Sequence, residues 1–258
     1  MSLRIESSVS DDLALARQLA ALASELALDY FQRGAPTKYK PDGTPVSHAD
    51  IEIERNLVDI LARRRPGDAV LGEEFGALGD SSRRWLIDPI DGTSNFVAGS
   101  SQWGTHVALQ YEQQIVLGII TRPVLGLSWW ACRGCGAYRS GTLESSDAVR
   151  LHVSAKSILI SSRVTMWTHE GDPMIARLKR SATWVEPDLD AILRLAEGEI
   201  EAVIDRQGKP WDHAPAVVLV QEAGGAFSDS RGGHRVDLGE GRYTNRLIHD
   251  QLEGLLNE

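Results

Sequence analysis

The 258-residue sequence is poor in cysteine and carries no excess of basic residues, and both features argue against certain classes of function. Its net charge of −9 argues against nucleic acid or an anionic membrane as the main partner. An anionic small molecule remains compatible, because bound metal ions can make a site locally positive. No run of about 18 apolar residues is present to span a membrane, and the polar N-terminus does not resemble a signal peptide. We therefore expect a soluble, cytoplasmic protein.

Several catalytic and binding motifs are also missing. The sequence has no P-loop, no G-x-G-x-x-G and no G-x-S-x-G, which argues against nucleotide-loop chemistry and a serine hydrolase. The two cysteines, Cys132 and Cys135, form a single C-x-x-C without the second pair that a zinc site needs. Their flanks are typical of strands, so we interpret them as two ordinary thiols in a turn. A redox switch is the alternative.

What is present is an ordinary globular composition, 42% hydrophobic and 24% charged, long enough for a sizeable core. Alternating segments predict an α/β layered fold. An antiparallel meander is expected from residue 104 to 138, extended at 149–153. The other expected strands are 69–71, a buried strand ending at 85–87, 158–160, 183–185 and 202–205. Helices are expected at 11–32, 49–65, 173–180, 189–197, from about 209 to 223, and at 245–256.

The stretch from Trp85 to Phe96 carries the clearest chemistry. Asp88 and Asp91 follow an apolar run and flank Pro89, which fixes one backbone angle. Gly92 permits conformations that other residues avoid. Two carboxylates held this close repel each other unless a cation or proton lies between them. This predicts a stiff elbow that presents oxygens to a hard cation such as Mg²⁺.

Other acids lie where they can join this elbow. Glu73 and Glu74 follow another strand, and strand ends in α/β sheets are where ligand groups gather. Asp212 lies near the start of a later helix, and Asp50 in the first turn of the helix that Ser47 caps. Two or three metal ions held there would activate water for attack on phosphorus, with backbone amides after the elbow holding phosphate oxygens. His106, inside a strand, is interpreted as a hydrogen-bonded core residue.

These motifs, taken in order, resemble the inositol monophosphatase superfamily over nearly the whole chain. They are Gly72-Glu73-Glu74, Asp88-Pro89-Ile90-Asp91-Gly92-Thr93, Trp211-Asp212-His213-Ala214 and Glu222-Ala223-Gly224-Gly225. The resemblance implies one αβαβα domain over residues 1–258, with an α+β half at about 1–155 and an α/β half at about 156–258. It also implies a homodimer, lithium sensitivity and hydrolysis of a small phosphate ester with two or three Mg²⁺ ions.

The resemblance also implies a role for each matching residue. The expected metal ligands are Glu73, Asp88, the Ile90 carbonyl, Asp91 and Asp212. Glu74 and Thr93 would position the attacking water, with Asp50 beside Thr93, and the Gly92 and Thr93 amides would hold phosphate. Lys40 matches a loop of the family that reaches the site.

The substrate is the least defined part of the prediction. Residues 40–46, 65–76 and 129–131 resemble the histidinol-phosphatase branch found in actinobacteria, which makes L-histidinol phosphate the first candidate. Asp188 and Asp205 could pair with a cationic substrate, although Asp188 and Asp190 could instead only cap a helix. Inositol, cyclitol, sugar or nucleotide phosphates are the alternatives within the class. A catalytically silent metal- or phosphate-binding regulator is the alternative from another class.

Overall fold

Two β-sheets organise the computed structural model, which describes residues 2–41, 43, 45–143 and 147–257. The larger sheet has the strand order β10-β9-β8-β7-β6-β5-β3-β4, and the smaller has the order β12-β11-β13-β15-β14. A hairpin of β1 and β2 stands apart from both. The strands are β1 Thr37–Tyr39, β2 Pro45–Ser47, β3 Ala69–Gly72, β4 Gly76–Leu78, β5 Arg83–Asp91, β6 Gly104–Tyr111, β7 Gln114–Arg122, β8 Leu127–Cys132, β9 Gly136–Ser140, β10 Val149–Arg150, β11 Arg163–Trp167, β12 Thr183–Trp184, β13 Ala202–Asp205, β14 Ala226–Asp229 and β15 Gly241–Thr244.

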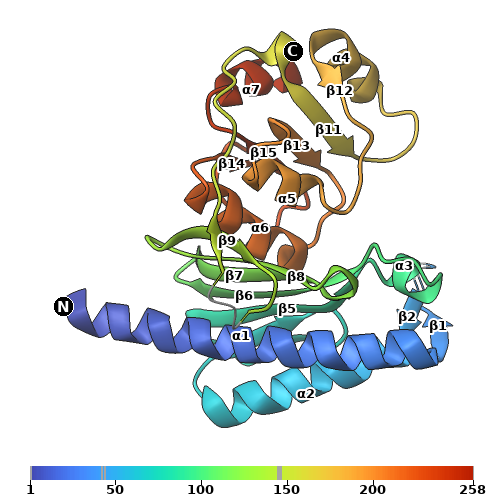
Figure 1. Ribbon diagram of the computed structural model, residues 1–258, viewed down its shortest axis with the longest axis vertical. Helices are drawn as coiled ribbons and strands as arrows, with labels where there is room; N and C mark the ends of the chain where they lie inside the picture. The colour runs from blue at the N-terminus through green and yellow to red at the C-terminus, as the bar shows by residue number, and fades with distance from the viewer. Residues whose placement is uncertain (1, 42, 44, 144–146, 258) are drawn as a thin grey trace.

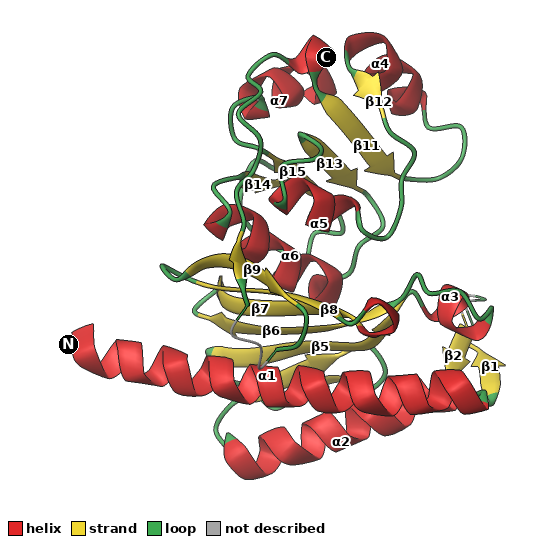
Figure 2. Ribbon diagram, viewed as in Figure 1, coloured by secondary structure: helices red, strands yellow, loops and turns green. Residues whose placement is uncertain are grey.

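Helices fill the spaces outside and between the sheets, giving five layers (Figures 1 and 2). Helices α1 and α2 cover the outer face of the large sheet. Helix α6, together with α5, lies between the sheets, and α4 and α7 cover the far face of the small sheet. This confirms the αβαβα layered fold. The helices are α1 Ser2–Arg33, α2 His48–Arg64, α3 Thr93–Val97, α4 Pro173–Ser181, α5 Ala191–Ala196, α6 Pro210–Glu222 and α7 His249–Asn257.

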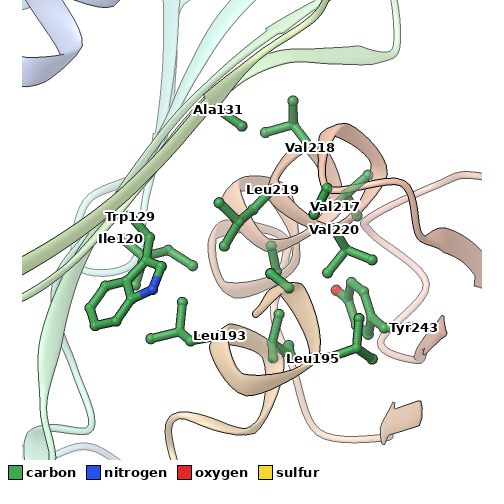
Figure 3. Close-up of a cluster of buried hydrophobic side chains, with 14 of the residues drawn as sticks. Ile120, Trp129, Ala131, Leu193, Leu195, Val217, Val218, Leu219, Val220 and Tyr243 are labelled. Carbon is green, nitrogen blue, oxygen red and sulfur yellow. The ribbon is translucent and has the colours of Figure 1, made fainter. Parts of the chain in front are cut away.

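Each interface between layers has its own apolar core. One core joins α1 and α2 to the large sheet, a second surrounds α6 and α5, and a third lies beneath α4 and α7. In the middle core, Leu219 and Val220 of α6 lie among Trp129 of the large sheet and Tyr243 of the small sheet (Figure 3). Burial of this apolar surface fixes α6 in place, and with it the acid in its first turn.

Close contacts determine where α2 begins and how near α6 lies to the large sheet. Ser47 and Asp50 form a reciprocal capping box, which confirms Ser47 as the N-cap of α2. On the large sheet, a Cβ at Gly118 would lie 2.5 Å from the Pro215 Cα, so only glycine lets α6 approach β7 this closely.

The meander is confirmed as β6 to β10, and β3 pairs in parallel with β5 as expected of two strands that deliver acids to one edge.

Three local predictions are wrong. Residues 158–160 are not a buried strand, since Ile158 and Ile160 are 59% and 62% exposed and β11 begins only at Arg163. The Ser161 and Ser162 hydroxyls donate to the Ile158 carbonyl and favour a 3₁₀ turn instead.

The buried strand ending at Ile87 is the second correction, because β5 continues through the two aspartates. Its pairing with β6 shifts register between Asp88 and Asp91, so the elbow is an irregularity within a strand. The cysteines are the third correction. Cys132 and Cys135 are not two free thiols but are joined in a disulfide that closes the β8–β9 turn. None of the described helices is long and apolar enough to cross a membrane.

Candidate active site

A cavity of about 450 Å³ opens where the predicted acids converge. Glu73 enters from the turn after β3, Asp88 and Asp91 from β5, and Asp212 from the first turn of α6. Gly92 lies between β5 and α3 with φ +82°, a left-handed conformation that favours glycine. The residues that line this cavity are Lys40, Pro45, Glu73, Asp88, Asp91, Gly92, Thr93, Ser94, Gln207, Lys209, Trp211 and Asp212.

The acids form a group suited to a metal ion. One ligand atom each from Asp88, Asp91, His106 and Asp212 lies within 4.8 Å of the others. Burial, followed by the charges of Glu73, Asp91 and Asp212, raises the pKa of Asp88 well above its usual value. Burial and the charge of Asp91 do the same to Asp212. A hard divalent cation would neutralise this repulsion, and carboxylate oxygens are the donors that Mg²⁺ prefers, so the residues fit the predicted ion.

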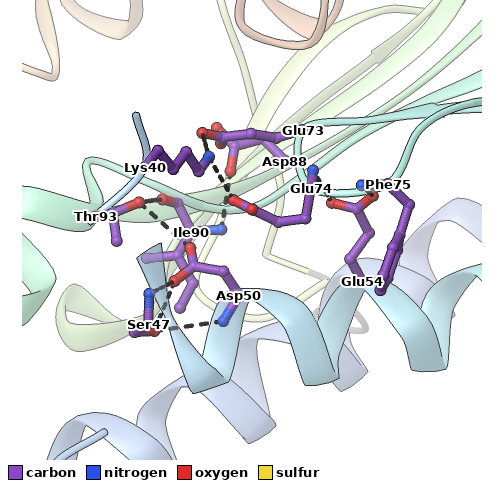
Figure 4. A network of polar contacts seen from close by, with 10 residues as sticks. All are labelled: Lys40, Ser47, Asp50, Glu54, Glu73, Glu74, Phe75, Asp88, Ile90 and Thr93. Atoms are coloured by element: carbon purple, nitrogen blue, oxygen red, sulfur yellow. Dashed lines mark hydrogen bonds and ion pairs between the residues drawn. The ribbon is translucent and has the colours of Figure 1, made fainter. Parts of the chain in front are cut away.

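Lys40 bridges the two adjacent glutamates. Its Nζ lies 2.8 Å from Glu73 Oε1 and 2.8 Å from Glu74 Oε1 (Figure 4). Burial opposes the ammonium charge, but the two hydrogen bonds and charges outweigh it and raise the pKa of Lys40. The structure therefore brings Lys40, Glu73 and Glu74 together beside the acidic group, as the sequence led us to expect.

Thr93, which lines the same cavity, is within reach of Asp50. The Thr93 hydroxyl is 3.0 Å from the Ile90 carbonyl and 3.3 Å from Asp50 Oδ1, and it can donate to one of them at a time. Asp50 is buried, which raises its pKa, and its Oδ2 accepts hydrogen bonds from Ser47. The hydroxyl proton thus has a carboxylate acceptor within reach.

Glu54 is a residue that the sequence analysis missed. Its carboxylate is fully buried and accepts hydrogen bonds of 2.8 and 2.9 Å from the backbone amides of Glu74 and Phe75 (Figure 4). A Cβ at Gly72 would lie 1.9 Å from Glu54 Oε1, so this glycine leaves the room that the carboxylate needs. Glu54 thereby holds the turn that carries Glu73 and Glu74.

His106 differs from the interpretation as a hydrogen-bonded core residue. It is buried, but neither ring nitrogen has a hydrogen-bond partner among the described residues. Its Nε2 lies 3.3 Å from Asp91 Oδ2. Burial lowers the pKa of His106 to about 4, so the ring is neutral at pH 7. No sequence signal separates this strand histidine from a core residue.

A second cavity, of about 240 Å³, adjoins the first and shares Asp91, Gln207 and Asp212 with it. Asp205 faces it from the end of β13, and its Oδ1 accepts hydrogen bonds from the Gln207 and Gly208 amides. Apolar and aromatic side chains form much of the remaining wall. The full lining is Asp91, His106, Ile120, Arg122, Trp167, Leu189, Ile192, Leu193, Asp205, Gln207, Gly208, Asp212 and Ala216.

Asp188, the other acid predicted for the substrate, lines neither of these cavities. Its Oδ2 forms an ion pair of 2.8 Å with Arg194, and its Oδ1 accepts the Asp190 amide. The alternative that Asp188 and Asp190 cap a helix is met only in part, because Asp190 is the N-cap residue of α5 but no side chain accepts a capping hydrogen bond there.

The comparisons with known proteins agree with this geometry. The sequence model of the inositol monophosphatase family matches residues 8–258. The chain belongs to the inositol monophosphatase family.

Individual relatives carry differing names. A Streptomyces griseus protein named glucose-1-phosphate thymidylyltransferase is 43% identical, over 96% of both chains. The histidinol-phosphatase of Streptomyces coelicolor is 37% identical over 96% of this chain and 97% of its own. Among solved structures, the IMPase of Thermotoga maritima superposes with a TM-score of 0.82 at 25% identity, covering 96% of this chain and 97% of that one. The family and fold are therefore shown, whereas the relatives do not agree on one substrate.

Proposed function

We propose that this protein is a Mg²⁺-dependent phosphomonoesterase. The observation that carries the proposal is the convergence of Glu73, Asp88, Asp91 and Asp212 on one cavity, with a threonine hydroxyl and a buried carboxylate beside it. Two or three Mg²⁺ ions, when bound, would supply Lewis acidity toward the phosphoryl oxygens and lower the pKa of water.

The protein residues would then divide the work. The carboxylates of Glu73, Asp88, Asp91 and Asp212 and the Ile90 carbonyl would hold the metal ions. Glu74 and Thr93 would position the attacking water, and Asp50 would accept the proton that passes through the Thr93 hydroxyl. The Gly92 and Thr93 amides would bind phosphate oxygens. The water oxygen forms a bond to phosphorus, and the bond from phosphorus to the ester oxygen breaks. The leaving oxygen takes a proton from solvent, to which Asp50 returns the proton that it accepted.

L-Histidinol phosphate is the first substrate to test. The histidinol-phosphatase relative supports it. The second cavity supports it as well, because Trp167 and the carboxylate of Asp205 suit an alcohol with a planar ring and a positive charge. Lys40, which lines the first cavity, would lie near the phosphate. Asp188, which pairs with Arg194, stays a proposed substrate-binding residue. Inositol-1-phosphate or another cyclitol, sugar or nucleotide phosphate is the second candidate, supported by the family.

The first test is phosphate release from a panel of esters with Mg²⁺, comparing the wild-type chain with Asp91→Asn. We expect turnover of histidinol phosphate that the variant abolishes. If the chain hydrolyses inositol-1-phosphate and not histidinol phosphate, inositol-1-phosphate becomes the proposed substrate. An inactive wild-type chain that still binds Mg²⁺ would favour the silent-regulator alternative. Activity retained by Asp91→Asn would overturn the metal assignment.

We also propose that residues 1–258 work as one domain, in the cytoplasm and as a homodimer. The first cavity draws Asp88 from the half at 1–155 and Asp212 from the half at 156–258, so neither half contains the whole site. Light scattering on the purified chain tests the dimer.

A further inference from the structure

Arg122, the last residue of β7, is an unusual feature of the second cavity. Its side chain is 3% exposed, yet it lies on the wall of a cavity that is otherwise largely apolar and acidic. A buried guanidinium is costly unless its donors are paired. Here Nε lies 2.8 Å from Asp190 Oδ1, Nη2 2.9 Å from the Leu189 carbonyl and Nη1 3.3 Å from the Thr121 carbonyl.

The partners of Arg122 come from different layers. Thr121 belongs to the large sheet, whereas Leu189 and Asp190 form the segment that leads into α5, between the sheets. The same guanidinium lies 3.7 Å from Asp91 Oδ2, at the end of β5. One side chain therefore fastens the segment before α5 to the sheet edge that carries the acidic group.

The surroundings are shaped to admit this side chain. A Cβ at Gly104 would lie 2.1 Å from Arg122 Nη1 and 2.0 Å from the Thr121 carbonyl, so the neighbouring strand can carry only glycine there without movement. On the other side, a Cβ at Gly92 would lie 3.4 Å from Leu189 Cδ2. The segment that Arg122 holds thus places the Leu189 side chain near the residue expected to bind phosphate.

We propose that Arg122 is a positioning residue that sets the shape of the second cavity and so the choice of leaving alcohol. It acts by holding Leu189 against the phosphate end of the site, and with it the start of α5, whose Ile192 and Leu193 form more of the wall. Its planar fork fits three acceptors at once, which a lysine ammonium at the same place does not reproduce. The inference rests on the proposed function, since it assigns this cavity to the alcohol of the ester.

The variant Arg122→Lys keeps the positive charge but removes the guanidinium. The variant Asp190→Asn keeps the shape of the side chain but removes the negative charge that pairs with Arg122. The matched control is Arg139→Lys, because Arg139 also bridges the large sheet to α5, through Glu197 at 3.3 Å, but lines neither cavity. Each variant is assayed with the best large ester from the panel and with glycerol 2-phosphate, whose small alcohol does not fill the cavity.

For Arg122→Lys and Asp190→Asn we expect KM for the large ester to rise by roughly ten- to a hundredfold with little change in kcat, because a displaced wall loses contacts with the alcohol that are equal in the ground state and the transition state. The values for glycerol 2-phosphate should stay close to wild type. The double variant should be no worse than the worse single variant, since both single variants weaken the same ion pair between Arg122 and Asp190. Arg139→Lys should match wild type throughout.

Hydrogen exchange provides the second readout and needs neither metal nor substrate. Amides at 189–193 should exchange faster in Arg122→Lys than in Arg139→Lys. Three outcomes would overturn the proposal. The first is an equal loss of activity toward both esters, and the second is unchanged kinetics and hydrogen exchange. The third is unfolding of both Arg122→Lys and Asp190→Asn while Arg139→Lys folds. If the wild-type chain hydrolyses no ester, the proposed function fails, and accelerated exchange at 189–193 would still show the positioning part to be right.

Discussion

Glu54 gives the sharpest test of how the site is built. Its pKa is raised to about 7 from 4.5, first by burial and then by the charges of Glu74 and Glu73, against the lowering effect of two backbone hydrogen bonds. A raised carboxyl pKa means that the folded state holds the proton more tightly than the unfolded chain. The stability from this group is therefore complete below pH 4.5 and is lost as the pH rises through 7.

The variant Glu54→Gln cannot lose a proton at this position, so the share of the pH-dependent loss of stability that comes from Glu54 should disappear. A difference of 2.5 pH units between folded and unfolded pKa corresponds to about 3 kcal/mol at about 1.4 kcal/mol per unit. Relative to wild type, Glu54→Gln should therefore gain about 3 kcal/mol, or roughly 6–10 °C in Tm, between pH 4.5 and 8. Its kcat should fall, because one amide oxygen replaces two carboxylate oxygens that hold the Glu74 and Phe75 amides.

The assay is chemical and thermal unfolding across this pH range in EDTA, with Asp59→Asn as the control because Asp59 is an exposed acid of the same helix. Parallel stability curves for wild type and Glu54→Gln would refute the reasoning, since they would mean that Glu54 titrates alike in both states. A full kcat in the variant would refute its role in holding the turn. Added Mg²⁺ should make the wild-type curve less steep, because it neutralises the nearby charges that add to the effect of burial on the pKa of Glu54.

Three further predictions concern the metal, the proton path and the disulfide. Mg²⁺ at a hundred times its Kd should stabilise the wild-type chain by about 2.7 kcal/mol per ion and leave the Tm of Asp91→Asn nearly unchanged; an equal Tm rise in both would contradict the metal site. Thr93→Ala should keep the Mg²⁺-induced Tm rise but lose about a hundredfold or more in kcat, and an active variant would remove Thr93 from the mechanism. Replacing Cys132 and Cys135 by serine should cost about 2 kcal/mol by loop entropy, with activity within about twofold of wild type. A large activity change in that variant, reproduced by dithiothreitol on wild type, would favour the redox-switch alternative.

The residues that the sequence predicted best are those whose geometry is local. Asp88, Asp91, Gly92 and Thr93 are neighbours in the chain, so a short irregular strand end is enough to place them together. Glu73 could be added because β3 and β5 are adjacent parallel strands whose ends meet at one edge. Asp212 could be added as a candidate oxygen donor at a helix start, but its role as a metal ligand came from the family resemblance, because no local pattern places it beside residues more than a hundred positions earlier.

The residues that were missed act through contacts between distant segments. Glu54 left a faint signal, because it falls on the buried stripe of α2 with Asp50, Ile53 and Leu57, where an acid must find partners. Arg122 gave an even weaker signal in the sequence. An arginine that follows an apolar strand is as typical of an exposed strand end as of a buried guanidinium. Its guanidinium is buried because the segment before α5 packs against it, and the periodicity of a strand does not predict such a contact.

The same contacts decide which charges the second cavity offers to a ligand. Asp188 and Asp205 were equal candidates in the sequence, but Arg194 pairs with Asp188 and Arg122 pairs with Asp190. Among the described residues, Asp205 has no arginine or lysine partner, and burial raises its pKa. Since bound metal ions would neutralise Asp91 and Asp212, Asp205 would be the carboxylate left to meet the alcohol. A positively charged group on that alcohol would lower the pKa of Asp205 again, and so this cavity should bind a cationic alcohol more tightly than a neutral one of the same size.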